Sequence, residues 1–270
     1  MQPAAADPSI APHQEDLDLA RVFSAYTISA VAWLLFSTFV GIVLAYKFGA
    51  PEFGSSEWLT FGRLRPIHTN ATFYGWASIG LVGLAYYVAA RSCRTSLYSV
   101  RMARIGLWLF NVAAIAGTVA LDLGYSAGDL EYREWPWSIG VIFLAALVVT
   151  AWNLVATVAQ RKTEDIYLSN WYTMGGTLWT CIIAVVAILP WYQYGLGQVS
   201  VSGFYMHNAV GMWFTPLALG IFYYALPKLL NQSIYSYALG VFALRKFRLW
   251  CTMAPASPSL DCAPTRSIAA

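Results

Sequence analysis

Apolar runs of membrane-spanning length alternate with short polar loops along this chain. A helix that crosses a bilayer needs about 20 mostly apolar residues, and six runs reach that length. A seventh run begins near Ile234 but meets Arg245 after roughly half of it. We therefore predict an all-α fold, a polytopic transmembrane helical bundle with six full spans plus a truncated seventh. The predicted spans are residues 24–46, 66–90, 105–121, 138–160, 172–191 and 203–226.

Three regions follow from this pattern. Residues 1–20 form a polar N-terminal segment, 21–244 the transmembrane domain and 245–270 a tail rich in Ser, Pro and Ala. The tail has no periodic apolar face, which is typical of disorder, and we interpret it as the result of a truncated or frame-shifted reading frame. The N-terminal segment lacks the basic n-region of a cleaved signal peptide, so we expect the first span to be retained.

The sixth predicted span is preceded by an uncharged segment and contains a proline. Residues 193–202, just before it, are uncharged and are expected to form a loop. Pro216 lies inside the span, where it removes a backbone hydrogen bond, and therefore predicts a kink.

Composition supports a membrane protein. Hydrophobic residues make up 59% of the chain and charged residues 11%, whereas soluble domains carry about a quarter charged residues. The net charge of +3 gives no case for a nucleic-acid partner. Membrane lipid is the expected surrounding.

Basic residues predict the orientation, because cytoplasmic loops carry an excess of Lys and Arg. With the N-terminus in the cytoplasm, eight basic residues of the loops and span ends lie inside and four outside. We therefore predict a multi-pass protein of the cell inner (plasma) membrane. The inside set is Arg21, Arg91, Arg94, Arg101, Arg104, Arg161, Lys162 and Lys228, and the outside set is Lys47, Arg63, Arg65 and Arg133.

The chain has three histidines, and two of them lie in predicted spans. His13 belongs to the polar N-terminal segment, and we assign it no role. A histidine inside a bilayer costs free energy unless a partner compensates its desolvation. His68 and His207 begin spans that enter from the same face, so we expect them at similar depth. Neutral imidazole binds haem iron and copper, which makes both histidines candidate metal ligands.

The surroundings of His68 suggest how a ligand would be held. Thr69 and Asn70 are candidate acceptors for its second ring nitrogen. The next residues on its helix face are small, which we expect to leave room for a flat ligand. They are Ala71, Thr72 and Gly75.

Arg63 and Arg65 precede His68 at the outer end of the same span. They have two interpretations, which the sequence leaves open. They are either ordinary interfacial anchors or partners of haem propionates, because a guanidinium group matches a carboxylate geometrically.

Two segments carry a family resemblance. Residues 65–71, Arg-Pro-Ile-His-Thr-Asn-Ala, resemble the Arg-Pro-x-His-Thr-Asn-Ala segment of the catalytic subunit of cbb-type (C-type) haem–copper cytochrome c oxidases. Residues 205–211, Tyr-Met-His-Asn-Ala-Val-Gly, are similar to that family's Tyr-Gly-His-Asn-Ala-Val-Gly, with Met206 in place of glycine. The likeness covers residues 18–244.

The resemblance implies roles for both histidines. His68 would be an axial ligand of the low-spin haem b, and His207 one of three histidine ligands of the copper beside a high-spin haem b. The family reduces oxygen to water with electrons from cytochrome c, pumps protons in aerobic respiration and works with cytochrome c-type subunits. Its remaining ligands belong to later helices, so the resemblance implies no complete catalytic site here and predicts that this chain is inactive alone.

Two alternatives stay open. Nitric oxide reductase shares the helix plan and the ligand histidines, and the residues that discriminate it would lie in later helices. A noncatalytic membrane transporter or haem protein could instead use the two histidines to bind a polar substrate or to form hydrogen bonds between helices.

Overall fold

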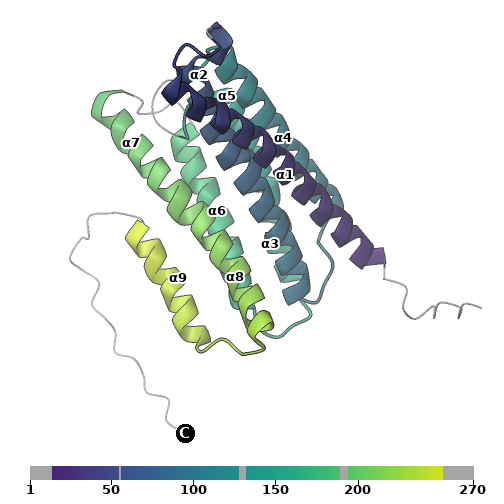
Figure 1. Ribbon diagram of the computed structural model, residues 1–270. Helices are drawn as coiled ribbons and strands as arrows, with labels where there is room; N and C mark the ends of the chain where they lie inside the picture. Colours follow the sequence, from purple (N-terminus) through teal and green to yellow (C-terminus); the bar gives the residue numbers. More distant parts are fainter. Residues whose placement is uncertain (1–13, 55, 128–131, 189–193, 252–270) are drawn as a thin grey trace, which may run out of the picture.

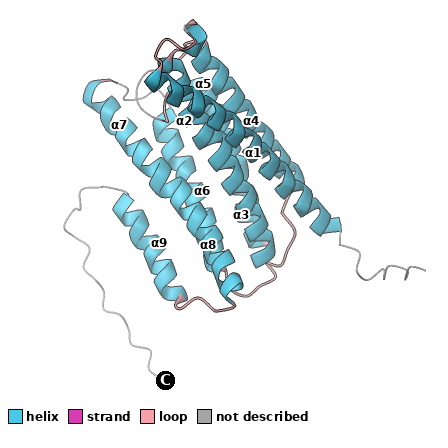
Figure 2. Cartoon of the chain, in the orientation of Figure 1, coloured by secondary structure: helices cyan, strands magenta, loops and turns pink. Residues whose placement is uncertain are grey.

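The computed structural model describes residues 14–54, 56–127, 132–188 and 194–251, with side chains as far as residue 244. This part of the chain consists of helices and connecting loops (Figures 1 and 2). Six helical segments in it are long and apolar enough to cross a membrane. The predicted all-α bundle with six spans is therefore confirmed. His13 and residues 252–270 of the expected tail lie outside the described residues.

Four of the spans are single helices and two are composite. A short 3₁₀ turn, η2 (Glu57–Leu59), precedes the first composite span, and α9 follows the second as a helix of 15 residues. The single helices are α1 (Gln14–Gly49), α4 (Val100–Asp122), α5 (Trp137–Ala159) and α6 (Leu168–Ile188). The composite spans are α2 (Phe61–Asn70), η3 (Ala71–Ala77) and α3 (Ser78–Ser92), then α7 (Gly195–Asn208), η4 (Ala209–Phe214) and α8 (Thr215–Leu230), with α9 at Tyr237–Cys251.

All six spans begin before the predicted residue, and two of them, at α1 and α7, extend furthest. α1 begins at Gln14, and its first turn carries Glu15 and Asp16, whose charges favour the positive end of the helix dipole. α7 begins at Gly195, so the loop predicted over residues 193–202 is wrong from residue 195 onward. No proline interrupts residues 195–202, and the helix of the span simply continues outward.

Both composite spans contain a π-helical segment directly after their histidine. η3 begins three residues after His68, and η4 begins two residues after His207. At the end of η4 the backbone N–H and the hydroxyl of Thr215 both donate to the carbonyl oxygen of Val210. The wider helical turn therefore ends just before Pro216, and the kink expected at Pro216 stays a prediction. Such π segments are frequent at functional sites.

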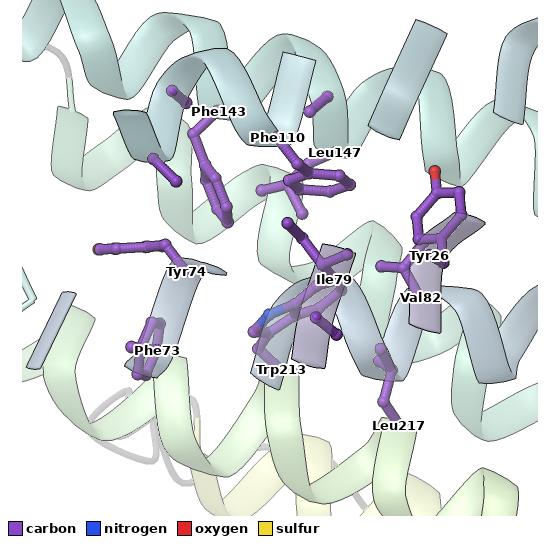
Figure 3. Close-up of a cluster of buried hydrophobic side chains, with 14 of the residues drawn as sticks. Tyr26, Phe73, Tyr74, Ile79, Val82, Phe110, Phe143, Leu147, Trp213 and Leu217 are labelled. Atoms are coloured by element: carbon purple, nitrogen blue, oxygen red, sulfur yellow. The ribbon is translucent and has the colours of Figure 1, made fainter. Parts of the chain in front are cut away.

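The core is aromatic and continuous through the bundle. Figure 3 shows Tyr74, Phe143 and Phe110 on one side of the cluster and Trp213 and Leu217 on the other. α1 packs along η3 and α3, α4 pairs with α5, and α6 pairs with α8. α9 lies against α6, where the Tyr172 hydroxyl donates to the carbonyl oxygen of Gly240 over 3.1 Å (Figure 1). The outward faces stay apolar, as a lipid surrounding requires.

Candidate metal-binding histidines on two adjacent helices

The imidazole ring of His68 is held by α1, the helix that packs against α2. Its Nδ1 lies 2.7 Å from the carbonyl oxygen of Ser37. A carbonyl can only accept, so Nδ1 carries the hydrogen and donates it. In the neutral ring this leaves Nε2 with its lone pair available, and no partner of Nε2 is found among the described residues. A metal-ligating histidine typically has this arrangement, in which the second nitrogen is fixed by a backbone or carboxylate oxygen.

Gly41 provides the space for this ring. A Cβ atom at residue 41 would lie 2.8 Å from Cε1 and 3.1 Å from Nδ1 of His68. Gly41 follows Ser37 by one helical turn, so the carbonyl and the gap lie on the same face of α1. The sequence contains a signal for this contact, a glycine within an apolar span, but the prediction did not use it.

The small residues after His68 do not leave room for a flat ligand, contrary to the prediction. A Cβ atom on Gly75 would lie 2.7 Å from Cγ of Trp33, whose ring covers this face of η3. Ala71 is buried, and the Thr72 hydroxyl donates to the carbonyl oxygen of His68 over 2.8 Å. Small residues serve close helix packing in membranes as readily as ligand binding, and here they let α1 approach.

Neither Thr69 nor Asn70 contacts the ring of His68. The Thr69 hydroxyl lies 3.2 Å from the carbonyl oxygens of Arg65 and Pro66. The Asn70 amide donates to the Pro66 carbonyl oxygen over 2.7 Å and to Oε2 of Glu134 over 3.0 Å. Both candidate acceptors therefore bond their own helix or the loop after α4.

Glu134 is a buried acid that the sequence interpretation did not single out. It lies in the loop before α5 and is 8% exposed. Burial raises the pKa of its carboxyl group above the ordinary value, while the Asn70 hydrogen bond and the charge of Arg65 act in the opposite direction. Its position close to Asn70 ties this loop to the histidine-bearing helix.

The two arginines occupy different surroundings at the outer end of α2. Nη1 of Arg63 donates to the carbonyl oxygen of Asp122 over 2.7 Å, at the end of α4. Its guanidinium carbon lies 5.4 Å from the ring centroid of Trp58. Arg65 is exposed, and its charge acts on Glu134. Arg63 thus has the contacts of an interfacial anchor, and propionate pairing of both arginines stays a prediction.

His207 lies near the end of α7 with its side chain exposed at the surface of this chain. Among the described residues no hydrogen-bond partner of its ring is found. Asn208 turns inward instead, where it donates to the Phe204 carbonyl oxygen over 2.8 Å and accepts from Nε1 of Trp179 over 3.2 Å. The amide beside His207 therefore does not orient its ring.

Aromatic and hydrogen-bond contacts join the two histidine-bearing helices. The hydroxyls of Tyr74 and Tyr205 are 2.8 Å apart, and the ring centroids of Phe73 and Phe214 are 4.3 Å apart. Both helices begin at the same end of the bundle (Figure 1). At 1.5 Å per residue, these pairings place His68 and His207 within about two turns of each other in depth.

A buried chain of hydrogen bonds reinforces this junction. Nε1 of Trp213 donates to the Ser78 hydroxyl over 3.0 Å, and that hydroxyl donates to the Phe73 carbonyl oxygen over 2.8 Å. Trp213 and Phe73 belong to η4 and η3, so the bonds connect the two π segments. In the part of the chain that the structure describes, no three His, Cys, Asp or Glu side chains converge on one point.

These features define a multi-pass helical membrane protein with two histidines at comparable depth on adjacent helices. Residues 21–251 match the family described as cytochrome c and quinol oxidase polypeptide I. The chain therefore belongs to this family, and the resemblance stated from its two histidine segments is confirmed.

Curated relatives agree with this assignment. The chain is 30% identical to the cbb3-type cytochrome c oxidase subunit CcoN1 of Stutzerimonas stutzeri, over 85% of this chain and 51% of that protein. It is 28% identical to a cytochrome c oxidase subunit 1 homolog of Agrobacterium tumefaciens (strain T37), over 79% of this chain and 42% of that protein. It is also 28% identical to cytochrome c oxidase subunit 1 of Rhodobacter capsulatus, over 82% of this chain and 44% of that protein. The chain spans about half the length of these relatives.

Proposed function

We propose that this chain is part of the catalytic subunit of a cbb-type terminal oxidase. In this proposal the complete oxidase transfers electrons from cytochrome c to oxygen, reduces it to water and pumps protons in the inner membrane, with the N-terminus of this chain in the cytoplasm. Its partners would be the cytochrome c-type subunits of the complex. The observation that carries the proposal is His68, whose Nδ1 is occupied by the Ser37 carbonyl oxygen while Nε2 stays available.

Two contacts of the His68 ring support a role as a haem ligand, whereas the Gly75 face of η3 is covered by Trp33. Gly41 makes room for the ring, and the Ser37 carbonyl oxygen selects the tautomer with the lone pair on Nε2. Haem iron held there would supply one-electron transfer. Arg63 and Arg65 at the outer end of α2 would compensate propionate charge, although Arg63 must then share its guanidinium with the Asp122 carbonyl oxygen.

His207 fits a metal ligand that is completed from outside this chain. Its ring is exposed and is not engaged by a described neighbour. Copper sites take neutral imidazole readily, and the two further histidine ligands implied by the family resemblance would come from beyond the part of the protein present here. We therefore expect this chain alone to have no oxidase activity.

The motifs favour an oxidase over the two alternatives. His-Thr-Asn-Ala and His-Asn-Ala-Val-Gly resemble the oxidase pattern more closely than that of nitric oxide reductase. A transporter that used the histidines for bonds between helices would pair both rings, whereas His207 is exposed.

The test is oxygen uptake with reduced cytochrome c as the donor. Membranes would contain this chain alone, or this chain fused to the C-terminal half of the Stutzerimonas relative. We expect no uptake from the chain alone and cyanide-sensitive uptake from the fusion. His68→Ala and His207→Ala should abolish it, while Cys181→Ser, a half-buried free thiol on α6, should not. Uptake by the chain alone, or full uptake with His207→Ala, would contradict the proposal.

A further inference from the structure

A second polar cluster lies inside the bundle, away from the histidines. It is formed by Tyr26 of α1, Tyr86 of α3 and Thr150 of α5, each with none of its surface exposed. The two tyrosine rings meet edge to face with centroids 5.6 Å apart. Figure 3 shows the hydroxyl of Tyr26 pointing away from the apolar side chains of Val82 and Leu217. Three hydroxyls from three helices thus lie in the interior, where lipid and bulk water cannot reach them.

Two of these hydroxyls make no hydrogen bond of standard geometry among the described residues. Tyr26 is satisfied as a donor, because its hydroxyl bonds the carbonyl oxygen of Ala103 over 2.8 Å. The Tyr86 and Thr150 oxygens are buried and lack such a bond in the part of the chain that the structure describes. The Tyr86 hydroxyl lies near enough to Thr150, Asn153 and Tyr26 for poorly aligned hydrogen bonding with all three, but none of these contacts has standard hydrogen-bond geometry. Poorly made hydrogen bonds leave two buried hydroxyls incompletely paired, which is unfavourable, and a further polar group between them would complete both.

Asn153 uses part of its hydrogen-bonding capacity on another helix. Its side-chain oxygen accepts from the Ser99 backbone N–H over 3.0 Å, and its amide donates to the Ser99 carbonyl oxygen over 3.1 Å. These bonds hold the Asn153 side chain at the start of α4. The N–H and the lone pair that Asn153 has left make no hydrogen bond of standard geometry with Tyr86 or Thr150 among the described residues.

Gly106 of α4 lies beside two of these oxygens. A Cβ atom there would lie 3.2 Å from the Tyr26 hydroxyl oxygen and 3.5 Å from the Thr150 hydroxyl oxygen. Because Gly106 has no side chain, the two hydroxyls face bare backbone on this side of α4. A buried water requires two to four polar partners, and Tyr26 and Thr150 supply two next to Gly106.

We propose that one water molecule is bound beside Gly106 and bridges the hydroxyls of Tyr26, Tyr86 and Thr150. Each of the three groups can donate or accept, so the water makes up to three hydrogen bonds and satisfies both unpaired oxygens. The hydroxyls are neutral, which favours water over an ion, because a desolvated charge needs an opposite charge. The water links α1, α3 and α5 across α4, and residue 106 is glycine because a methyl group would displace it.

The sign of a stability change tests this proposal. Tyr86→Phe and Thr150→Val each remove one hydroxyl while nearly keeping the side-chain shape. If water bridges them, each substitution breaks a hydrogen bond and lowers the melting temperature of the purified chain in detergent by about 2–4 °C. The double substitution should cost less than the two single losses added together, because both act on the same water.

Gly106→Ala separates a bridging water from a direct Tyr86–Thr150 bond. With the water displaced, Tyr86→Phe and Thr150→Val should no longer lower the melting temperature, and their coupling should vanish. Gly80→Ala is the matched control, since its Cβ would meet only the Ala30 Cβ atom at an ordinary 3.5 Å. The control should leave the coupling intact.

Three results would overturn the proposal. A rise in melting temperature with Tyr86→Phe or Thr150→Val would mean that the hydroxyls are unpaired and dry. Coupling that persists with Gly106→Ala would mean a direct bond. If Gly106→Ala does not fold, an electron cryo-microscopy map of the unsubstituted protein decides. Density within hydrogen-bond distance of all three oxygens supports the water, and its absence where other buried waters are visible rejects it.

Discussion

Gly41→Ala is the substitution that acts most directly on the packing around the His68 ring. The new methyl carbon would lie 2.8 Å from Cε1 of His68, whereas ordinary contacts begin at 3.4 Å. The ring must therefore move by about 0.6 Å, away from the position in which Nδ1 bonds the Ser37 carbonyl oxygen. Overpacking of this kind costs about 1–3 kcal/mol, against a gain of about 0.5–1 kcal/mol for replacing a helical glycine with alanine.

The measurement is thermal unfolding of the purified chain in detergent, with Gly80→Ala as the reference. Gly80→Ala gains the same helix propensity without a steric clash against a neighbouring side chain. We therefore expect the Gly41→Ala variant to be less stable than the Gly80→Ala variant by about 1–3 kcal/mol. That difference corresponds to about 2–4 °C for each kcal/mol.

A second variant isolates the ring as the cause. In a His68→Ala background the clash is gone, and Gly41→Ala should behave like Gly80→Ala. An equal loss with and without the imidazole would refute the reasoning, because the cost would then arise elsewhere on α1.

Three further predictions concern the surroundings of the two histidines. Trp213→Phe and Ser78→Ala should each lower the unfolding free energy by about 0.5–1.5 kcal/mol and should be non-additive in a double-mutant cycle, because they share one hydrogen bond. His207→Ala should change the stability of the chain by less than about 0.5 kcal/mol in the same unfolding assay, since the ring is exposed. Burial raises the pKa of Glu134 above its ordinary 4.5, so the folded chain binds this proton more tightly than the unfolded chain. That stabilisation is complete below pH 4.5 and is lost as the pH rises through the folded pKa. Glu134→Gln should remove this dependence in melting curves recorded across that range.

The spans could be predicted because length and apolar composition alone decide which segments cross a bilayer. The residues at which the spans begin and end could not be predicted in the same way. The helix of the sixth span continues outward to Gly195 through residues that carry no charge and no proline. The π segments were also beyond prediction, because the apolar pattern is the same for an α-helical and a π-helical turn.

The histidines were identifiable because an ionisable residue in an apolar span is costly. The groups that contact the histidine rings could not be identified from the sequence. The group that orients His68 is the backbone carbonyl of Ser37 on another helix, and a carbonyl has no signature in the sequence. Gly75 was misread for a related reason, because a small residue accommodates a neighbouring helix and a ligand equally well, and here Trp33 occupies the space.

The central claim is that His68 is a haem ligand through Nε2. An optical titration of the purified chain with ferrous protohaem tests this claim most directly. We predict one equivalent of bound haem with a shifted Soret band. His68→Ala should abolish the shift, and the exposed His207→Ala should retain it. A spectrum unchanged by His68→Ala, or no haem bound by any variant, would contradict the account.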